Sequence, residues 1–242
     1  MGRMAAGVGM GLAGEIAGMM IGSPVGAVFG VWLRRQIGPT PSTMEAEEPS
    51  LSIHVHDRMP PIPKDQWTAE QQDAAATFTR LRKQDVFGPF AVMLRSPEVM
   101  LRAGAMGDYM RHHTVLPPRL NEFIILITAR HWTQQFEWYV HQPEALKAGL
   151  SPEIVNAITH GRRPTGMSDE EKTVHDFTLE LLRGQNVSDP TYAAAVARFG
   201  EQGVIDMVGV AGYYTFLSMM MNMARTAVPG DSTVPPLVAL ET

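Results

Sequence analysis

The sequence predicts an all-α protein, and two observations support that prediction. Beyond Pro63, apolar residues recur every three or four positions, as on helix faces, and few runs show the two-residue alternation of strands. Helix-start signals recur along the same stretch, where Ser or Thr precedes Pro or stands three residues before Glu or Gln. The chain of 242 residues could form one large domain or two small ones. Roughly 170 residues remain for a core once an unusual N-terminus is set aside.

The first two predicted helices follow capping signals. We expect a helix over residues 67–83, because Thr68 is followed by Gln71 in the pattern of a capping box. Ser96 begins the next helix, with Ser as the cap and proline at the first helical position, and that helix reaches about Tyr109. The Arg-His-His run that follows it, residues 111–113, is expected on a loop surface.

The middle of the chain predicts a buried helix and then a second, amphipathic one. Residues 119–129 follow a pair of prolines and contain FIILITA, which is apolar on all sides and so typical of a buried helix. A break is expected over residues 131–133, with Thr133 as the cap of the next helix. Residues 134–141 continue as an amphipathic helix.

The remaining helices are predicted from Ser151, from Ser168 and from Asp189, and a last one covers residues 201–225. The last helix is apolar around its whole circumference. Its large apolar residues are Tyr213, Tyr214, Phe216, Met219, Met220, Met221 and Met223. Such a helix is typical of a core or a subunit interface rather than of a cofactor site.

Residues 1–35 form a Gly-rich apolar extension, which we expect to be helical. Its glycines recur every three or four residues, at Gly7, Gly11, Gly14, Gly18, Gly22, Gly26 and Gly30. Such a stripe permits close helix packing in a membrane, and residues 4–33 are long enough to span a bilayer. Glu15 and Pro24 oppose this interpretation, because one is charged and the other breaks or kinks a helix. A membrane-associated or self-packing helix, a flexible or spurious extension and a cleaved targeting segment all stay open.

The rest of the chain divides by composition. Residues 36–56 are rich in Pro, Ser, Thr and Glu, which is typical of a linker. We place the helical domain at residues 57–228 and a C-terminal tail at residues 229–242. Because every motif residue lies within the domain, residues 1–56 are expected to affect location or solubility rather than chemistry.

Composition excludes several classes of function. The net charge is −5, and residues 1–43 carry three Arg against one Glu, so the remainder carries −7 and a nucleic-acid partner is not expected. The absence of cysteine excludes disulfides, thiolate metal sites and a cysteine nucleophile, and it fits a reducing compartment such as the cytoplasm. We expect a cytoplasmic protein, associated with a membrane if residues 4–33 anchor it.

No motif for a cofactor or a metal is found. The sequence has no GxGxxG, Walker or HExxH pattern, so phosphate cradling and zinc-protease chemistry are not supported. The adjacent His112 and His113 would point to different faces of a helix, which makes chelation by this pair improbable. We therefore expect neither a cofactor nor a bound metal.

Four polar residues stand at a distinctive spacing. Gln134, Glu137 and His141 follow Glu122 by 12, 15 and 19 positions. If residues 134–141 are helical, Glu137 and His141 are i,i+4 neighbours on one helix face. This arrangement places an acid beside a group that can shuttle protons.

This spacing resembles the superfamily of carboxymuconolactone decarboxylase and alkylhydroperoxidase D. In its peroxidase branch the positions of Gln134 and Glu137 hold the two cysteines of a Cys-x-x-Cys, and the last position is His. A Glu in place of the second cysteine, with the His retained, is similar to the decarboxylase branch, whose chemistry is proton transfer. The resemblance covers about residues 57–228, and residues 168–225 match only in helical pattern.

The resemblance implies an all-helical domain that assembles as a trimer or hexamer. It also implies a cofactor-independent lyase acting on a small unsaturated organic acid or lactone. Isomerisation, hydration or lactone opening on the same fold stays open. So does a non-catalytic helical oligomer in which the motif is structural, while a thiol peroxidase is least favoured because the cysteines are absent.

Three residues are the candidate catalytic groups. His141 can give and take a proton near neutral pH. Glu137 could orient the imidazole or protonate the substrate itself, and the alternative is a solvated Glu–His pair. Glu122 interrupts a buried apolar helix and must find a partner or hold a proton. The resemblance implies a proton relay for it, and the alternative is an ion pair with Arg119 or Arg130.

Three further residues are candidates for binding the substrate. Gln134 could hydrogen-bond a substrate carbonyl or a water molecule. Arg130 and His131 lie just before it, and Arg130 could pair with a substrate carboxylate through two hydrogen bonds. Structural ion pairing is an equally good explanation for Arg130.

Overall fold

The computed structural model describes residues 57–239, and these residues form only helices and their connections. In chain order the helices are η1 (Lys64–Gln66), α1 (Ala69–Arg82), α2 (Pro89–Met93), α3 (Pro97–His112), α4 (Pro118–His131), α5 (Gln135–Lys147), α6 (Pro152–Thr159), α7 (Asp169–Gly184) and α8 (Asp189–Ala224). No strand occurs in this part of the chain, which confirms the all-α prediction. The predicted Gly-rich extension (1–35) and linker (36–56) lie outside the described residues.

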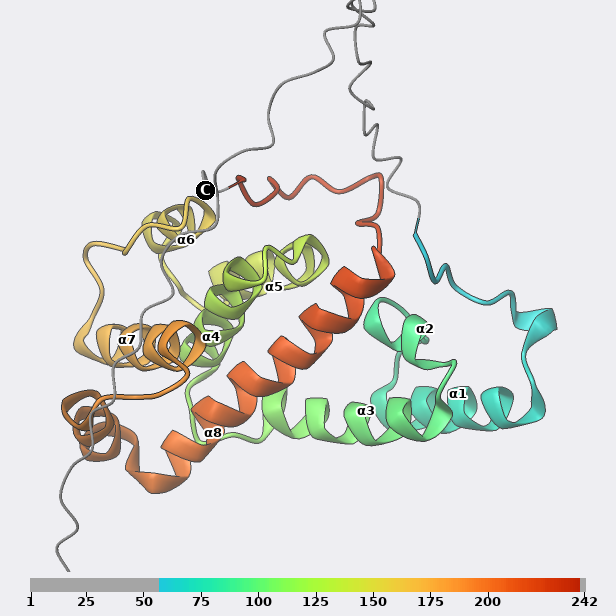
Figure 1. Cartoon of the computed structure of the whole chain (residues 1–242), viewed down its shortest axis with the longest axis horizontal. Coiled ribbons are helices and arrows are strands. Elements are labelled where there is room, and N and C mark those ends of the chain that lie inside the picture. Colours follow the sequence, from blue (N-terminus) through green and yellow to red (C-terminus); the bar gives the residue numbers. More distant parts are fainter. Residues whose placement is uncertain (1–56, 240–242) are drawn as a thin grey trace, which may run out of the picture. The chain divides into compact units, whose positions relative to one another are not determined.

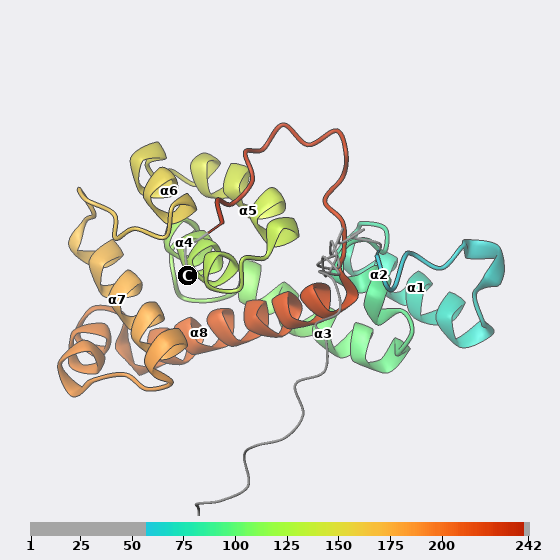
Figure 2. The same ribbon diagram turned by 45° about the horizontal axis from the view of Figure 1, so that its top comes forward.

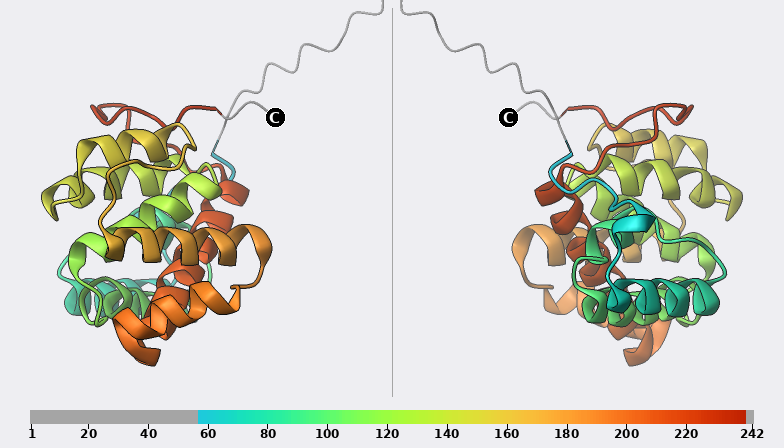
Figure 3. Two further views of the ribbon diagram at one scale, coloured as in Figure 1. Left: turned by 90° about the vertical axis from the view of Figure 1, so that its left-hand side faces the viewer. Right: turned by 90° about the vertical axis from the view of Figure 1, so that its right-hand side faces the viewer.

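Helix α8 runs between two groups of helices (Figure 1). On one side it packs against α4 and α7, and on the other against α2 and α3. Helix α4 is buried over most of its length and also contacts α5, which lies beside it in Figure 2. Helix α1 packs along α3, as the right-hand view of Figure 3 shows. Helix α4 therefore lies between α5 and α8, and α3 packs against α8 from the other side.

Two predicted helix starts form complete capping boxes. The Thr68 hydroxyl accepts from the backbone N–H of Gln71 at 3.2 Å, and the Gln71 side chain accepts from the Thr68 N–H at 3.0 Å. Ser168 and Glu171 repeat this pattern at 3.2 and 2.7 Å. These starts are local, since four consecutive residues satisfy two backbone donors that the helix leaves unpaired.

The structure differs from the predicted elements at three places. The cap of α5 is Gln134 rather than Thr133, which adopts a left-handed conformation with φ of 47°. The two segments predicted from Asp189 and over residues 201–225 join in α8, where Gly200 interrupts the helix with φ of 69°. The short helix α2 was not predicted, because five residues carry too little periodicity to identify it.

Helix α8 is long and apolar enough to cross a membrane by length and composition. More than half of its most apolar stretch, 56%, is buried inside the domain, and a core helix of a globular protein meets the same criteria. Met221 and Ala224 are fully buried near its end, whereas Met219 and Met223 are exposed. Its composition therefore fits the core packing that the sequence analysis expected.

The described part of the C-terminal tail lies along α5. The Gln135 side chain donates to the carbonyl of Leu237 at 3.1 Å and accepts from the Leu237 N–H at 2.9 Å. The Trp138 indole N–H donates to the carbonyl of Pro235 at 3.0 Å, and the Leu237 side chain is buried. These contacts hold α5 from the side away from α8.

Candidate active site

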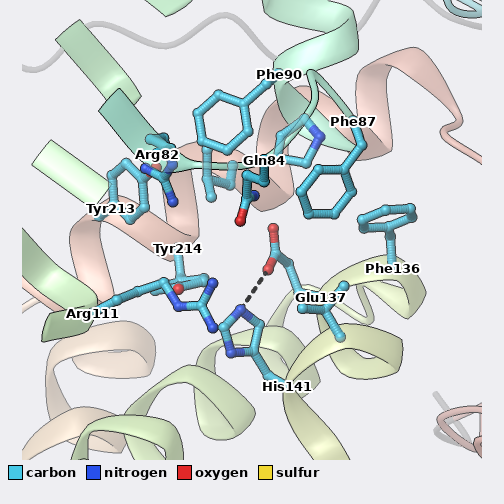
Figure 4. Close-up of a pocket in the computed structure, with 13 residues that line it drawn as sticks. Arg82, Gln84, Phe87, Phe90, Arg111, Phe136, Glu137, His141, Tyr213 and Tyr214 are labelled. Atoms are coloured by element: carbon cyan, nitrogen blue, oxygen red, sulfur yellow. Dashed lines mark ion pairs between the residues drawn. The ribbon is translucent and has the colours of Figure 1, made fainter. Parts of the chain in front are cut away.

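Side chains from four parts of the domain surround a small hollow (Figure 4). They come from the end of α1 with its connection to α2 and the start of α2, from the last turn of α3, from α5 and from α8. The hollow holds about 30 Å³ of free space, which is room for a water molecule. Its polar lining consists of Arg82, Gln84, Arg111, Glu137, His141, Tyr213 and Tyr214.

Glu137 and His141 reach the hollow from one face of α5, and Glu122 on α4 stands behind them. The helical spacing places Glu137 Oε2 3.4 Å from His141 Nε2 (Figure 4). Glu122 Oε2 lies 2.7 Å from the other ring nitrogen, His141 Nδ1. The side chains of His141 and Glu137 are only 3% and 4% exposed. The imidazole thus connects two carboxyl groups, of which Glu137 is the one that lines the hollow.

The hydrogen bond to Glu122 orients the imidazole. When Nδ1–H donates to the Glu122 carboxylate, the lone pair of Nε2 is left on the side of Glu137. The ring of Tyr214 packs edge-on against the imidazole at 4.9 Å between centroids and 87° between planes. Glu122 pairs with neither Arg119 nor Arg130, because Arg119 binds the carboxylates at the start of α7.

Burial raises the pKa of Glu137 to about 7, and this is the largest influence on its carboxyl group. The neighbouring His141 and Arg111 favour the carboxylate and oppose the shift, while the charge of Glu122 adds to it. Glu137 Oε1 is buried and has no hydrogen-bond partner among the described residues. Near neutral pH, Glu137 therefore exists in both protonation states, as a general acid or base must.

Gln134 is buried and holds the start of α5 rather than lining the hollow. Its side-chain carbonyl accepts from the N–H of Phe136 at 2.6 Å. Its amide donates to Asn222 Oδ1 at 2.8 Å, and Asn222 in turn donates to the carbonyl of Trp132 at 2.9 Å. Gln134 thus fastens α5 to the end of α8, which fixes the helix that carries Glu137.

The structure does not bring Arg130 or His131 to the hollow. The guanidinium of Arg130 donates to the carbonyl of Thr159 at 3.1 Å, to that of Val238 at 2.5 Å and to Thr133 Oγ1 at 2.7 Å. Its hydrogen bonds join α4 to α6 and to the C-terminal tail. His131 is exposed beside Trp132. Both lie in the last turn of α4, outside the lining of the hollow.

Arg111 was expected on a loop surface, and this expectation was wrong. It lies in the last turn of α3, half-buried, and lines the hollow with Arg82 from the end of α1. The sequence carries one signal for this position, because Gly104, Gly107 and Arg111 share a face of α3 and bare glycines allow close approach. Tyr213 of α8 fills the space beside Gly107.

We expect Gly107→Ala to displace Tyr213 from the wall of the hollow. A Cβ atom at position 107 would lie 2.2 Å from Tyr213 Oη, too close for either group to stay. Overpacking of this kind costs about 1–3 kcal/mol, which urea unfolding measures. Gly212→Ala is the matched control, because its Cβ would meet no atom within 4 Å, and it should stabilise α8 by about 0.5–1 kcal/mol. Equal effects of the two substitutions would contradict the close packing of Tyr213.

Comparisons with known proteins assign no family. No family profile and no curated protein matches this sequence. Among the solved structures that resemble the chain is a crystal structure of a protein of unknown function from Agrobacterium tumefaciens, described as a candidate antioxidant defence protein AhpD. The match covers 57% of this chain and 96% of that chain, with 17% identity and a TM-score of 0.49.

Proposed function

We propose that this protein is a cofactor-independent lyase of the carboxymuconolactone decarboxylase type, acting on a small unsaturated organic acid or lactone. One observation carries the proposal. Glu137 lines a hollow with a buried oxygen that has no hydrogen-bond partner within residues 57–239, beside an imidazole that Glu122 orients. A buried carboxyl group in this position is costly for folding, and proton transfer gives it a role.

The proposed reaction moves one electron pair and one proton. The bond between a carboxylate carbon and its neighbour breaks, CO₂ leaves, and the electron pair enters the conjugated carbonyl of the substrate. Protonated Glu137 then delivers its proton to the carbon that carries the charge. A proton from water then binds His141 at Nε2 and passes to Glu137, which restores the acid, while Glu122 stabilises the transient imidazolium at Nδ1. The same groups would serve an isomerisation, in which no carbon–carbon bond breaks.

A substrate larger than a water molecule requires a wall of the hollow to move. Gln84 and Phe87 line the hollow from the connection between α1 and α2, and Phe87 is exposed. Gly88, next to Phe87, has φ of 55°, and Phe136 packs against its backbone. We propose that this connection opens to admit the substrate and that the closed state excludes water from the proton transfer.

The experiment that tests the proposal is a screen of unsaturated lactones and keto acids for CO₂ release by the full-length protein. Product analysis in D₂O follows any proton transfer that occurs without release of CO₂. His141→Ala is the control for each compound. A compound that the wild-type protein converts and the His141→Ala variant does not would support the proposal. Failure of every compound in both assays favours the non-catalytic alternative, in which the motif only packs α4 against α5.

Thiol peroxidase activity is the function that the amino-acid composition argues against most strongly. The chain has no cysteine, so we expect its consumption of hydroperoxide, coupled to a dithiol reductant, to equal that of a blank without protein. The rate of peroxide loss is followed at several protein concentrations. A rate that rises with protein concentration and saturates with peroxide would overturn this prediction.

Self-association is part of the proposal. Several apolar side chains remain exposed on α3 and α8, among them Met106, Tyr109, Ile205, Met219 and Met223. Exposed apolar residues on adjacent helices are a surface that a second copy of the chain could cover. We propose a cytoplasmic homo-oligomer, a trimer or hexamer, whose attachment to a membrane depends on residues 4–33.

A further inference from the structure

Two arginines face the hollow and lack a counterion in the described part of the chain. Arg82 and Arg111 both line it, and in Figure 4 they approach from the side opposite Glu137. The Nε atom of each is buried without a hydrogen-bond partner among residues 57–239. A buried N–H donor without a hydrogen-bond partner destabilises the folded state. Guanidinium groups stay charged at all physiological pH values, so neither residue can avoid this destabilisation by losing a proton.

The surrounding residues orient the two guanidinium groups but leave their Nε–H donors without a hydrogen-bond acceptor. Arg82 donates from Nη1 to the carbonyl of Gly104 at 2.6 Å, and its guanidinium lies over the rings of Phe78 and Phe90 at 5.4 and 5.0 Å. Arg111 stands in the last turn of α3, where the helix dipole favours a cation. Packing thus holds both groups in place, and their buried Nε–H donors stay unpaired within the described residues.

We infer that Arg82 and Arg111 form a subsite that anchors a carboxylate of the substrate and makes the protein select acids over their neutral analogues. This inference rests on the proposed function, since it concerns the substrate of the same site. Each guanidinium presents parallel N–H donors that match the two oxygens of a carboxylate. A substrate carboxylate would satisfy donors that are otherwise buried and unpaired, which is a strong source of selectivity.

The subsite also decides which part of the substrate reacts. A carboxylate held by two cations is stabilised as an anion, so it is an anchor rather than the group that leaves as CO₂. Because the arginines come from α1 and α3 and Glu137 comes from α5, a carboxylate anchored on the arginines would leave the conjugated carbons of the molecule free to reach Glu137. Recognition and proton delivery thereby fall to different residues.

The inference can be tested without knowledge of the natural substrate. Crotonate, a small unsaturated carboxylate, is titrated into the full-length protein, and the Nε–H signals of the arginines are followed by NMR. Crotonamide is the neutral probe of the same shape. We expect crotonate to shift the signals of Arg82 and Arg111, and crotonamide to leave them in place.

Variants connect the binding to individual residues. Arg111→Gln removes the charge and the forked donors while leaving a polar side chain, and it should weaken crotonate binding about tenfold to a hundredfold. Arg111→Lys should restore part of that loss, since the charge returns without the second donor. Arg102→Gln on the exposed side of α3 should leave binding unchanged, because Arg102 pairs with Glu98 in solvent. Circular dichroism checks that each variant retains its helices.

The outcomes separate this inference from the proposed function. Equal binding of crotonate and crotonamide, no binding of crotonate, or unchanged binding by a folded Arg111→Gln variant would overturn the subsite. Selective binding that depends on Arg111 supports it even if no compound of the screen is turned over. In that case the proton-transfer proposal fails and the acid-binding site stands.

Discussion

Replacement of His141 by Ala, or of Glu137 by Gln, is expected to reduce turnover by about 10²–10⁴ while helix content and assembly stay unchanged. His141→Ala removes the ring nitrogens that lie 2.7 Å from Glu122 and 3.4 Å from Glu137. Glu137→Gln keeps the shape of the side chain but removes the proton that the substrate would receive. Steady-state rates on a substrate from the screen measure both losses.

His113→Ala is the matched control for this prediction. His113 also stands near a carboxylate, with Nε2 3.4 Å from Asp108, but both side chains are largely exposed and lie outside the hollow. The control variant should react at the wild-type rate. Wild-type turnover by His141→Ala would remove the imidazole from the mechanism, whatever the behaviour of Glu137.

Glu137→Gln should also stabilise the folded protein at pH 8, and this is the second large effect. The pKa of Glu137 rises from an ordinary value of 4.5 to about 7 on folding, mainly because the carboxyl group is buried. The folded state therefore binds this proton more tightly than the unfolded state does. Its stabilising contribution is complete below pH 4.5 and is lost as the pH rises through 7. At pH 8 the wild-type protein carries a buried charge that costs about 3 kcal/mol, and the Gln variant does not.

Urea unfolding at several pH values measures this difference. The variant and the wild-type protein should have similar stability near pH 4, and the advantage of the variant should grow between pH 4.5 and pH 7. Glu98→Gln is the control, because Glu98 is exposed and its pair with Arg102 lies in solvent. A Glu137→Gln variant less stable than wild type at pH 8 would mean that the carboxylate is well satisfied in the folded state. A gain in stability together with a loss of activity is typical of a catalytic residue.

Local interactions account for the parts of the fold that were predicted correctly. Thr68 and Ser168 cap their helices by hydrogen bonds with residues three positions later. Both partners therefore lie within four consecutive residues, and the sequence pattern is enough to predict the cap. Thr133 was expected to cap α5 for the same reason. In the structure its hydroxyl accepts from Arg130, and Gln134 caps the helix while it also binds Asn222 of α8. A contact between residues far apart in sequence decided this helix start, and the local pattern does not contain it.

The candidate site divides in the same way. The i,i+4 spacing brings Glu137 and His141 together on one helix, and the spacing to Glu122 was identified through a family resemblance rather than through geometry. The glycine face of α3 is a local signal for Arg111, but its pairing with Arg82 could not be found from sequence, because the two residues lie on different helices that both line the hollow. Arg130 was given a binding role because it stands beside the motif, but its Nη1 donates to carbonyls of α6 and the C-terminal tail, away from the hollow.

The proposed mechanism requires Glu137 to hold a proton near neutral pH while it lines the hollow. The most direct test is a ¹³C NMR titration of the Glu137 carboxyl carbon in the full-length protein, assigned with the Glu137→Gln variant. We expect a midpoint near pH 7, because burial raises the pKa of Glu137 to about that value. A midpoint at or below the ordinary value of 4.5 would contradict the proposed mechanism, since the carboxylate would then have no proton to deliver at neutral pH.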